Sequence, residues 1–250
     1  MVSKRLTTSG NGGRAAMCSR YDLTSPPEAV RACFEYIDKP NFPPRDNIRP
    51  TEPIAVVLLD AEGRRRFSLM RWGLLPHFVK DPKKFPTLFN ARSEELLAKP
   101  SFRSAARRRR CLIPADGFYE WTGPKGQRTP YYIRPEPPNL FAFAGLYERW
   151  SEPEGGVIDT ATMLTCEPNA KVAPLHNRMP VILAPDRYSA WLDTKDVSAE
   201  EALDMTGPAP DDLLKAIPMP RTSTARSKAK HKGQDKDEDN KKESLQPPLL

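Results

Sequence analysis

The chain has 250 residues, of which 38% are hydrophobic, enough for one domain with a substantial core and for some residues outside it. No apolar run approaches the ~20 residues of a membrane helix, and the N-terminus lacks a secretory signal, so a soluble cytoplasmic protein is expected. The four cysteines form no CxxC pair, which argues against structural zinc and predicts free thiols. No metal or other cofactor is expected.

The net charge of +7 is unevenly distributed along the chain. Residues 17–134 carry 22 basic and 13 acidic residues, whereas residues 135–220 carry 6 basic and 14 acidic ones. A polyanionic partner would therefore bind a face that is built mostly by the first of these parts. The alternative is a salt-bridged globule with an ordinary scatter of charge.

Both ends of the chain differ in composition from the part between them. Residues 1–16 are rich in Ser, Thr and Gly, and they predict a leader that is disordered or absent from the mature protein. Residues 221–250 alternate Lys with Asp or Glu, which predicts a disordered, solvated tail. Residues 17–220 are expected to form one domain.

In chain order, short apolar segments alternate with proline-rich loops. The predicted strands are Ile54–Leu59, Phe67–Trp72, Phe118–Trp121, Tyr131–Arg134, Leu140–Trp150, Thr160–Thr165 and Met179–Leu183. The predicted helices are Pro27–Ile37, Glu94–Leu97, Phe102–Arg108, Asp186–Leu192 and Asp211–Ala216. Long helices do not alternate with the strands, so we expect a single α+β domain with a mainly antiparallel, curved, barrel-like sheet and short flanking helices.

The first segment with a chemical signature is Met17-Cys18-Ser19-Arg20-Tyr21. Initiator methionine is trimmed before small residues, so a start at Met17 would leave Cys18 with a free α-amine. The amine of such a 1,2-aminothiol forms a Schiff base with an aldehyde, and the thiol then closes a thiazolidine ring intramolecularly. An α-amine pKa of about 7.7–8 leaves a usable neutral fraction at physiological pH. Taken alone, Cys18 would be a disordered thiol.

Three later segments carry further candidates. Phe89–Glu94 places Asn90 and Arg92 at a predicted loop-to-helix junction, Glu120 lies among aromatic residues after a glycine turn, and His176 precedes a strand. Taken singly, Asn90 would be a helix cap, Glu120 a salt-bridged strand residue and His176 a hydrogen-bonded loop residue.

Together these segments resemble the SOS response-associated peptidase (SRAP) family of abasic-site crosslinking proteins. The matching stretches are MCSRY at 17–21, RWGLLP at 71–76, FNARSE at 89–94, RRCLIPADGFYEW at 109–121 and HNRMPVIL at 176–183. The resemblance implies an SRAP-like fold and a covalent thiazolidine crosslink to abasic sites in single-stranded DNA, which shields the lesion during the DNA damage response. A monomer that works in the cytoplasm at the nucleoid is expected.

The same resemblance implies four catalytic roles. Cys18 would supply both nucleophiles, and Asn90 would hold this residue and the sugar by hydrogen bonds. Glu120 would move protons as a general base, and His176 would act as general acid on the sugar hydroxyl as the ring opens. A carboxylate and an imidazole suit these transfers, and an aromatic neighbour such as Trp121 would raise the pKa of Glu120 by desolvation.

The expected DNA-binding residues are Arg20, Trp72, Gly73, Arg92, Trp121 and Arg178. Arg20 and Arg92 would bind phosphates that flank the lesion, because guanidinium groups bind phosphates bidentately. Arg178 is either a third contact or a buried structural partner. Trp72 and Gly73 resemble the family's wall for the displaced bases, which needs an exposed indole; the alternative is a core tryptophan. One or two members of Arg107–Arg110 are expected to touch phosphate.

The chain departs from the family pattern at its start, where sixteen residues precede the Met-Cys pair. Either translation begins at Met17, which we favour, or the extension is removed, by self-cleavage assisted by Glu120 or His176. Two other functions remain open. One is a thiol peptidase that acts on proteins, with Cys18 as nucleophile and His176 as base; the other is a non-catalytic module that binds single-stranded DNA.

Overall fold

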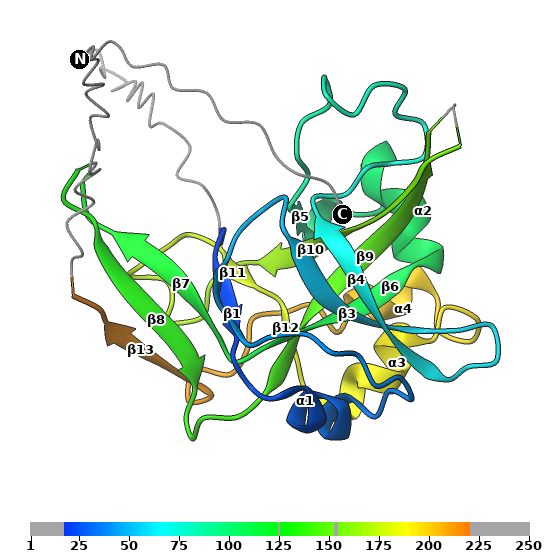
Figure 1. Cartoon of the computed structure of the whole chain (residues 1–250). Coiled ribbons are helices and arrows are strands. Elements are labelled where there is room, and N and C mark those ends of the chain that lie inside the picture. Colours follow the sequence, from blue (N-terminus) through cyan, green and yellow to red (C-terminus); the bar gives the residue numbers. More distant parts are fainter. Residues whose placement is uncertain (1–17, 125, 153–154, 221–250) are drawn as a thin grey trace, which may run out of the picture.

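Five strands of the larger sheet close into a ring at the centre of the computed structural model, which describes residues 18–124, 126–152 and 155–220 (Figure 1). Four neighbouring pairs of the ring are antiparallel, whereas β4 and β10 run parallel. The members of the ring, in spatial order, are β10 (Val157–Cys166), β4 (Arg65–Trp72), β3 (Pro53–Leu59), β6 (Arg110–Ala115) and β9 (Phe141–Ser151). The predicted α+β class with a barrel-like sheet is confirmed.

Short strands extend this ring at its open edges. β5 (Asn90–Arg92) runs parallel to β10, β11 (Met179–Pro180) pairs with the end of β10, and β12 (Ile182–Leu183) pairs with β9. Strand β5 therefore lies at the same end of β10 as the segments next to β11 and β12.

A second sheet lies beside the ring, at the left of Figure 1, and has the order β13-β8-β7-β1-β2. Its strands are β1 (Tyr21–Leu23), β2 (Arg45–Ile48), β7 (Gly117–Thr122), β8 (Thr129–Pro135) and β13 (Leu214–Pro218). The chain passes from β6 of the ring into β7 of this sheet across Asp116 alone. Gly117 permits the passage, because a Cβ at this position would collide with the ring of Tyr132.

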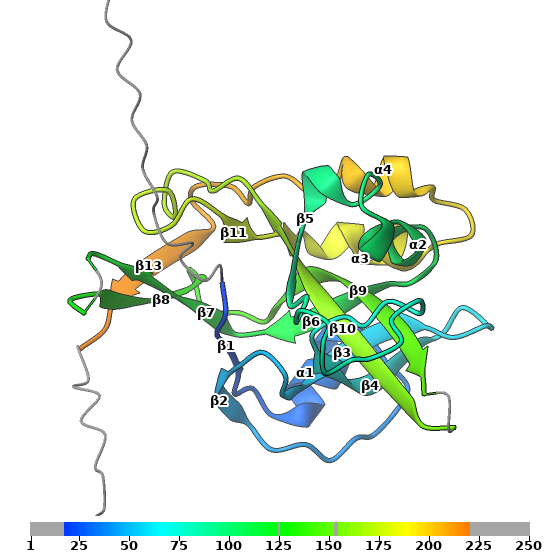
Figure 2. The ribbon, with the colours of Figure 1, turned by 90° about the horizontal axis from the view of Figure 1, so that it is seen from above.

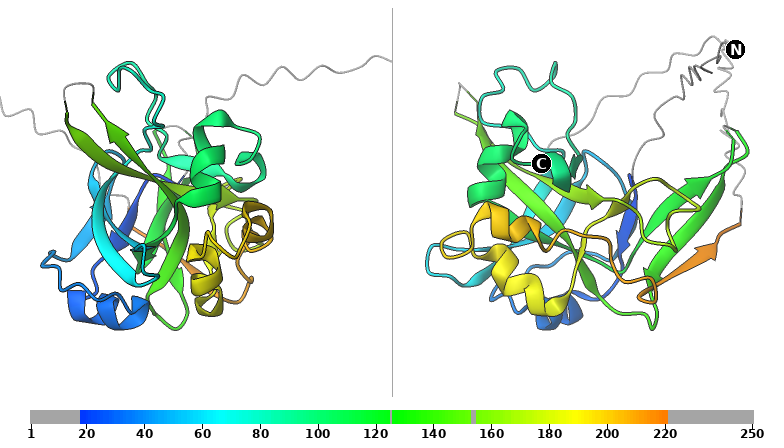
Figure 3. Two further views of the ribbon diagram at one scale, coloured as in Figure 1. Left: turned by 90° about the vertical axis from the view of Figure 1, so that its right-hand side faces the viewer. Right: turned by 180° about the vertical axis from the view of Figure 1, so that it is seen from behind.

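The helices are short and lie on the outside of the ring, as Figures 1 and 3 show. They are α1 (Pro27–Phe34), η1 (Ser93–Glu95), α2 (Pro100–Arg108), η2 (Pro185–Arg187), α3 (Tyr188–Leu192) and α4 (Ala199–Leu203). Proline in the first turn starts α1, α2 and η2, where its missing N–H costs no hydrogen bond. Arg110 of β6 is 2% exposed and donates to carbonyls that include those of Trp191 and Val197, so it anchors the α3–α4 region to the ring.

Every predicted strand is present, but two element predictions need correction. Asp211–Ala216 was expected to be helical, whereas Leu214–Pro218 is strand β13, because its backbone pairs with β8 along five residues. The predicted strand Met179–Leu183 is divided into β11 and β12, which pair with different partners. Tertiary pairing outweighs local propensity in both segments.

The core contains apolar residues for which the sequence indicated no functional role. Trp150 and Trp191 are buried, and all four cysteines are free thiols, as the sequence predicted, with Cys33 the exposed one. No helix in the described part of the chain is long and apolar enough to cross a membrane. The predicted leader 1–16 and tail 221–250 lie outside the described residues.

Candidate active site

Cys18 lies just before β1, the strand of the second sheet that pairs with β7 on one side and with β2 on the other. Tyr21 of β1 pairs with Phe118 of β7, and the N–H of Tyr119 donates to the carbonyl of Arg20 at 2.9 Å. This register carries Cys18 to the position beside Glu120, and only 2% of its surface is exposed. The two views of Figures 1 and 2 show β1 between β7 on one side and β5 on the other.

The thiol of Cys18 donates a hydrogen bond to Oε1 of Glu120. Glu120 shares the buried face of β7 with Phe118, since side chains two residues apart on a strand point the same way, and it is 2% exposed. Burial disfavours the carboxylate and raises the pKa of Glu120 to about 7, although hydrogen bonds from the thiol and backbone of Cys18 oppose the shift. This carboxyl group therefore exchanges its proton near neutral pH.

Burial also raises the pKa of the Cys18 thiol well above its usual value, and the neighbouring Glu120 raises it further. A thiol in this setting stays protonated at neutral pH. Reactive cysteines of thiol peptidases lie in electropositive surroundings that stabilise the thiolate. The environment of Cys18 has the opposite character, which disfavours a thiolate-first reaction.

Asn90 contacts Cys18 from the other side. Its side-chain amide Nδ2 donates to the Cys18 carbonyl at 3.0 Å, and its backbone pairs with Met163 of β10. Asn90 is thus a strand residue that holds the backbone of Cys18, and the alternative of a helix cap is wrong. The residue that caps the following turn η1 is Arg92, which makes no side-chain cap hydrogen bond.

His176 lies in the loop before β11, with its ring held by the backbone of Arg178. Nδ1 lies 3.1 Å from both the N–H and the carbonyl oxygen of Arg178, so it accepts from the N–H when it is unprotonated and donates to the carbonyl when it is protonated. Nε2 is buried and has no hydrogen-bond partner among the described residues. Burial lowers the pKa of His176, which keeps the imidazole neutral. The carbonyl of Arg178 lies 4.0 Å from the Cys18 sulfur, so this loop reaches the thiol.

The guanidinium of Arg178 is occupied by protein groups. It donates to both carboxylate oxygens of Glu94, at 2.6 and 2.7 Å, and to the carbonyl of Thr165 at 2.7 Å. Its side chain is 11% exposed. These contacts fit the alternative in which Arg178 is a structural partner, one that fixes the loop carrying His176.

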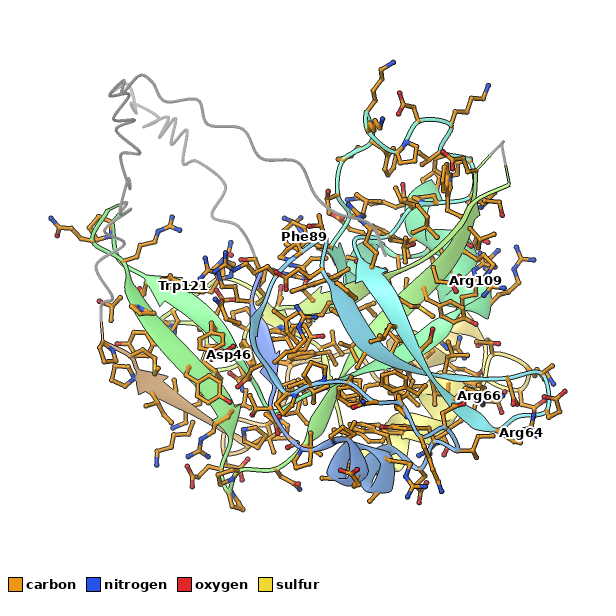
Figure 4. All side chains as sticks on the ribbon, in the orientation of Figure 1. Asp46, Arg64, Arg66, Phe89, Arg109 and Trp121 are labelled. Carbon is orange, nitrogen blue, oxygen red and sulfur yellow. The ribbon has the colours of Figure 1, made fainter. Side chains whose placement is uncertain are left out.

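Arg20, Arg92 and Trp121 are the more accessible of the expected DNA-binding residues. Arg20 lies over the indole of Trp121, with its guanidinium carbon 5.0 Å from the ring centroid. Arg92 is 43% exposed and has one long contact, 3.4 Å, with Glu95. Figure 4 shows Trp121 on the second sheet and Phe89 at the start of β5, on opposite sides of β1.

Trp72 does not present an exposed indole, and this expectation is wrong. The residue is 0% exposed, its Nε1 donates to the carbonyl of Phe89 at 2.7 Å, and Tyr21 packs edge-on at 5.4 Å. Through this hydrogen bond Trp72 holds the backbone of Phe89, the residue that precedes β5. Gly73 has a φ of +142°, in the region that favours glycine, and directs the chain into the following segment.

Phe78, to which the sequence did not point, is an exposed aromatic residue in the segment after Gly73. Its side chain is 49% exposed. The local signal was the polar His77 beside it, which interrupts the apolar run from Gly73 to Pro76. His77 itself lies 3.9 Å from Glu148, so it does have a partner, which the sequence had not suggested.

Known proteins resemble this chain over most of its length. A family model described as "SOS response associated peptidase (SRAP)" matches residues 17–223. The chain is 37% identical to the abasic site processing protein YoqW of Bacillus subtilis over 205 residues, which cover 80% of this chain and 91% of YoqW. It is 32% identical to the abasic site processing protein HMCES of Pongo abelii over 243 residues, covering 77% of this chain and 69% of the relative.

Solved structures share the fold. A protein from Bacteroides thetaiotaomicron superposes with a TM-score of 0.74 at 22% identity, covering 82% of this chain and 93% of that one. A protein from Bordetella bronchiseptica gives a TM-score of 0.71 at 28% identity, covering 81% and 100% of the two chains. With the family match spanning the whole described domain, the chain belongs to the SOS response-associated peptidase (SRAP) family.

Proposed function

We propose that this protein binds abasic sites in single-stranded DNA and traps them as a thiazolidine through Cys18. Relatives named abasic site processing proteins support the choice of lesion. The observation that carries the chemistry is the contact between Cys18 and Glu120. Both the thiol and the backbone nitrogen of Cys18 engage a carboxyl group whose pKa is about 7.

The reaction begins when the cyclic sugar opens to its aldehyde. Glu120 takes the proton of the hemiacetal hydroxyl, and the imidazolium form of His176 donates its Nε2 proton to the ring oxygen, which becomes a sugar hydroxyl; the proton on Glu120 then returns to His176 and restores both groups. The imidazolium is the acidic form of this side chain, and in it Nδ1 donates to the Arg178 carbonyl, 3.1 Å away, which opposes the effect of burial on the pKa of His176. Asn90 keeps Cys18 in place meanwhile.

The α-amine of Cys18 then attacks the aldehyde carbon. The carbinolamine loses its hydroxyl as water, with a proton from Glu120, and leaves an imine. The sulfur adds to the imine carbon, and the thiol proton passes through Glu120 to the nitrogen, so the net reaction releases one water. A shuttle with a pKa of about 7 is well matched to an α-amine of about 7.7–8 and moves protons both ways at neutral pH.

This chemistry needs a free amine at Cys18. Removal of an initiating Met17 would supply it, and so would self-cleavage of a longer N-terminal segment. In that reaction the Cys18 thiol adds to the carbonyl of Met17, the peptide C–N bond breaks as the thiol proton passes to the Cys18 amine, and water hydrolyses the thioester to a carboxylate and the free thiol. Mass spectrometry of the protein purified from its own cells tests this requirement. A mature chain that starts before Cys18 and still crosslinks would refute the role of the amine.

The accessible cations would position the DNA. Arg20 and Arg92 are proposed to contact phosphates on either side of the lesion, and Trp121 to offer its indole to a neighbouring base. Gly73 is proposed to shape the adjoining wall. A protein that acts on chromosomal lesions in this way is expected to work in the cytoplasm, at the nucleoid, as a monomer.

The decisive experiment incubates the processed protein with a single-stranded oligonucleotide that contains one abasic site. We expect a shifted band that survives heat and SDS, and its loss in Cys18→Ser. Complexes that salt or denaturant dissolves completely would support a non-catalytic DNA-binding module instead. Cleavage of unrelated proteins that depends on Cys18 would support a peptidase.

A further inference from the structure

A cavity of about 470 Å³ opens between α2 and the segment that follows β4. His77 and Phe78 line it from that segment, and Arg103, Arg107 and Arg108 line it from α2. None of the proposed catalytic residues contributes to its wall. The cavity is therefore a feature separate from the site around Cys18.

The arginines of this cavity are poorly neutralised by the rest of the protein. The guanidinium of Arg103 makes no hydrogen bond or ion pair with another described residue, although its backbone N–H donates to the carbonyl of Lys99, and the guanidinium of Arg108 donates to Ser104 at 3.1 Å. Arg107 lies 3.8 Å from Glu200, but both side chains are more than half exposed, so this pair contributes little.

Arg109, the next arginine along the chain, differs from these three because a buried carboxylate neutralises it. Arg109 donates to Glu148 at 2.7 Å, and the side chain of Glu148 is 6% exposed. A buried carboxylate thus neutralises Arg109, whereas the three arginines of α2 keep their charge available at the cavity. We therefore expect the cavity to bind an anionic group that is small enough to fit into it.

Both walls of the cavity are continuous with the candidate active site. Helix α2 follows β5 and η1, which carry Asn90 and Arg92, and the other wall belongs to the segment that connects Gly73 to Phe89. A bridge between Leu74 and Leu88 closes the base of that segment. Seen from above, β1, β5 and α2 follow one another across the molecule (Figure 2).

We infer that this cavity is a second nucleic-acid subsite, which holds backbone phosphates of the strand whose abasic sugar reaches Cys18; the inference rests on the proposed function. Guanidinium groups bind phosphates through paired hydrogen bonds. Arg103 and Arg107 are four residues apart, about 6 Å along the helix axis, so they can reach adjacent phosphates of one strand. The half-exposed ring of Phe78 adds apolar surface beside them.

The test measures non-covalent binding in a Cys18→Ala background, so that affinity is independent of crosslinking. The double variant Arg103→Ala/Arg107→Ala is compared with Arg187→Ala/Lys215→Ala, which removes the same charge from exposed side chains away from the cavity. Each protein is titrated at several salt concentrations with oligonucleotides that extend either 5′ or 3′ of the lesion, and with a short one that contains little beyond it.

We expect the cavity variant to lose affinity about tenfold for an oligonucleotide with one of the two extensions, and its salt slope to fall by about 1.4 units, or about 0.7 for each phosphate contact removed. The short oligonucleotide and the control variant should show neither change. Equal losses in both variants, or an unchanged salt slope, would overturn the inference. If the unmodified protein formed no SDS-stable adduct, the proposed function would be refuted. The comparison of non-covalent binding could still be interpreted in that case.

Discussion

The thiol of Cys18 donates a hydrogen bond to the carboxyl group of Glu120, a residue 102 positions later in the chain. The pairing of β1 with β7 brings the two together, and burial of both keeps the thiol protonated and the carboxyl group half-ionised at neutral pH. A nucleophile and its proton carrier are thus already in contact before a substrate binds, and the predictions below depend on this relationship.

Replacing Glu120 by Gln should slow crosslinking strongly without weakening DNA binding. The amide keeps the shape of the side chain but cannot carry protons, and loss of a general base typically costs about 10²–10⁴-fold in rate. Single-turnover crosslinking on denaturing gels measures the rate, and fluorescence anisotropy measures binding. Glu62→Gln, an exposed carboxylate in the β3–β4 turn, serves as the control. Equal losses of rate and affinity would show that Glu120 only supports the fold.

The same carboxyl group should make the protein less stable as the pH rises. The pKa of Glu120 is about 7 in the folded state against about 4.5 when unfolded, so the folded state binds more protons between these values. The free energy of unfolding should fall by up to about 3 kcal/mol from pH 4.5 to 7, less where relaxation or water entry softens the burial. Asp22, with a pKa of about 6, contributes in the same direction.

Urea unfolding at pH 5 and pH 8 tests this, and Glu120→Gln isolates the contribution of one residue. The variant should show a smaller fall in unfolding free energy over this range than the unmodified protein. An identical pH dependence in both proteins would mean that Glu120 ionises normally in the folded state.

Trp72→Ala should destabilise the protein by about 3–5 kcal/mol, because it leaves a cavity in the core and removes the hydrogen bond to Phe89. Phe78→Ala should change the free energy of unfolding by no more than about 0.5 kcal/mol, since its ring is largely at the surface. Denaturant unfolding of the two variants compares them directly. If Trp72→Ala changed the free energy of unfolding only slightly, the indole would not lie in the core.

Glu94→Gln should reduce the rate of crosslinking at saturating DNA and change its pH profile. The amide of Gln lacks the negative charge and offers one acceptor oxygen in place of two, so Arg178 loses its ion pair and one of its two hydrogen bonds to this side chain. The backbone of Arg178 contacts His176, so the change reaches the imidazole. Glu94→Asp should restore part of the rate if its shorter carboxylate still reaches the guanidinium. A variant that loses only DNA affinity, with the pH profile unchanged, would assign Arg178 to phosphate binding instead of positioning.

The sequence determined four of the five strands of the ring, all but β6, and it pointed to the candidate site residues. β3, β4, β9 and β10 are long runs of β-branched, aromatic and other apolar residues, and such runs predict strands without reference to the rest of the chain. Cys18, Asn90, Glu120 and His176 were found because each lies within a short motif that resembles one family, in the same order along the chain.

Only the tertiary structure decided how these parts meet. β1, β5 and β13 are too short or too proline-rich to be recognised locally, and they exist because a neighbouring strand completes their hydrogen bonds. Periodicity alone does not tell a tryptophan under a strand from one at the surface, so the burial of Trp72 was not visible in the sequence. The pKa of Glu120 likewise depends on how much water the folded chain removes from around it, a property that arises only once distant segments pack together.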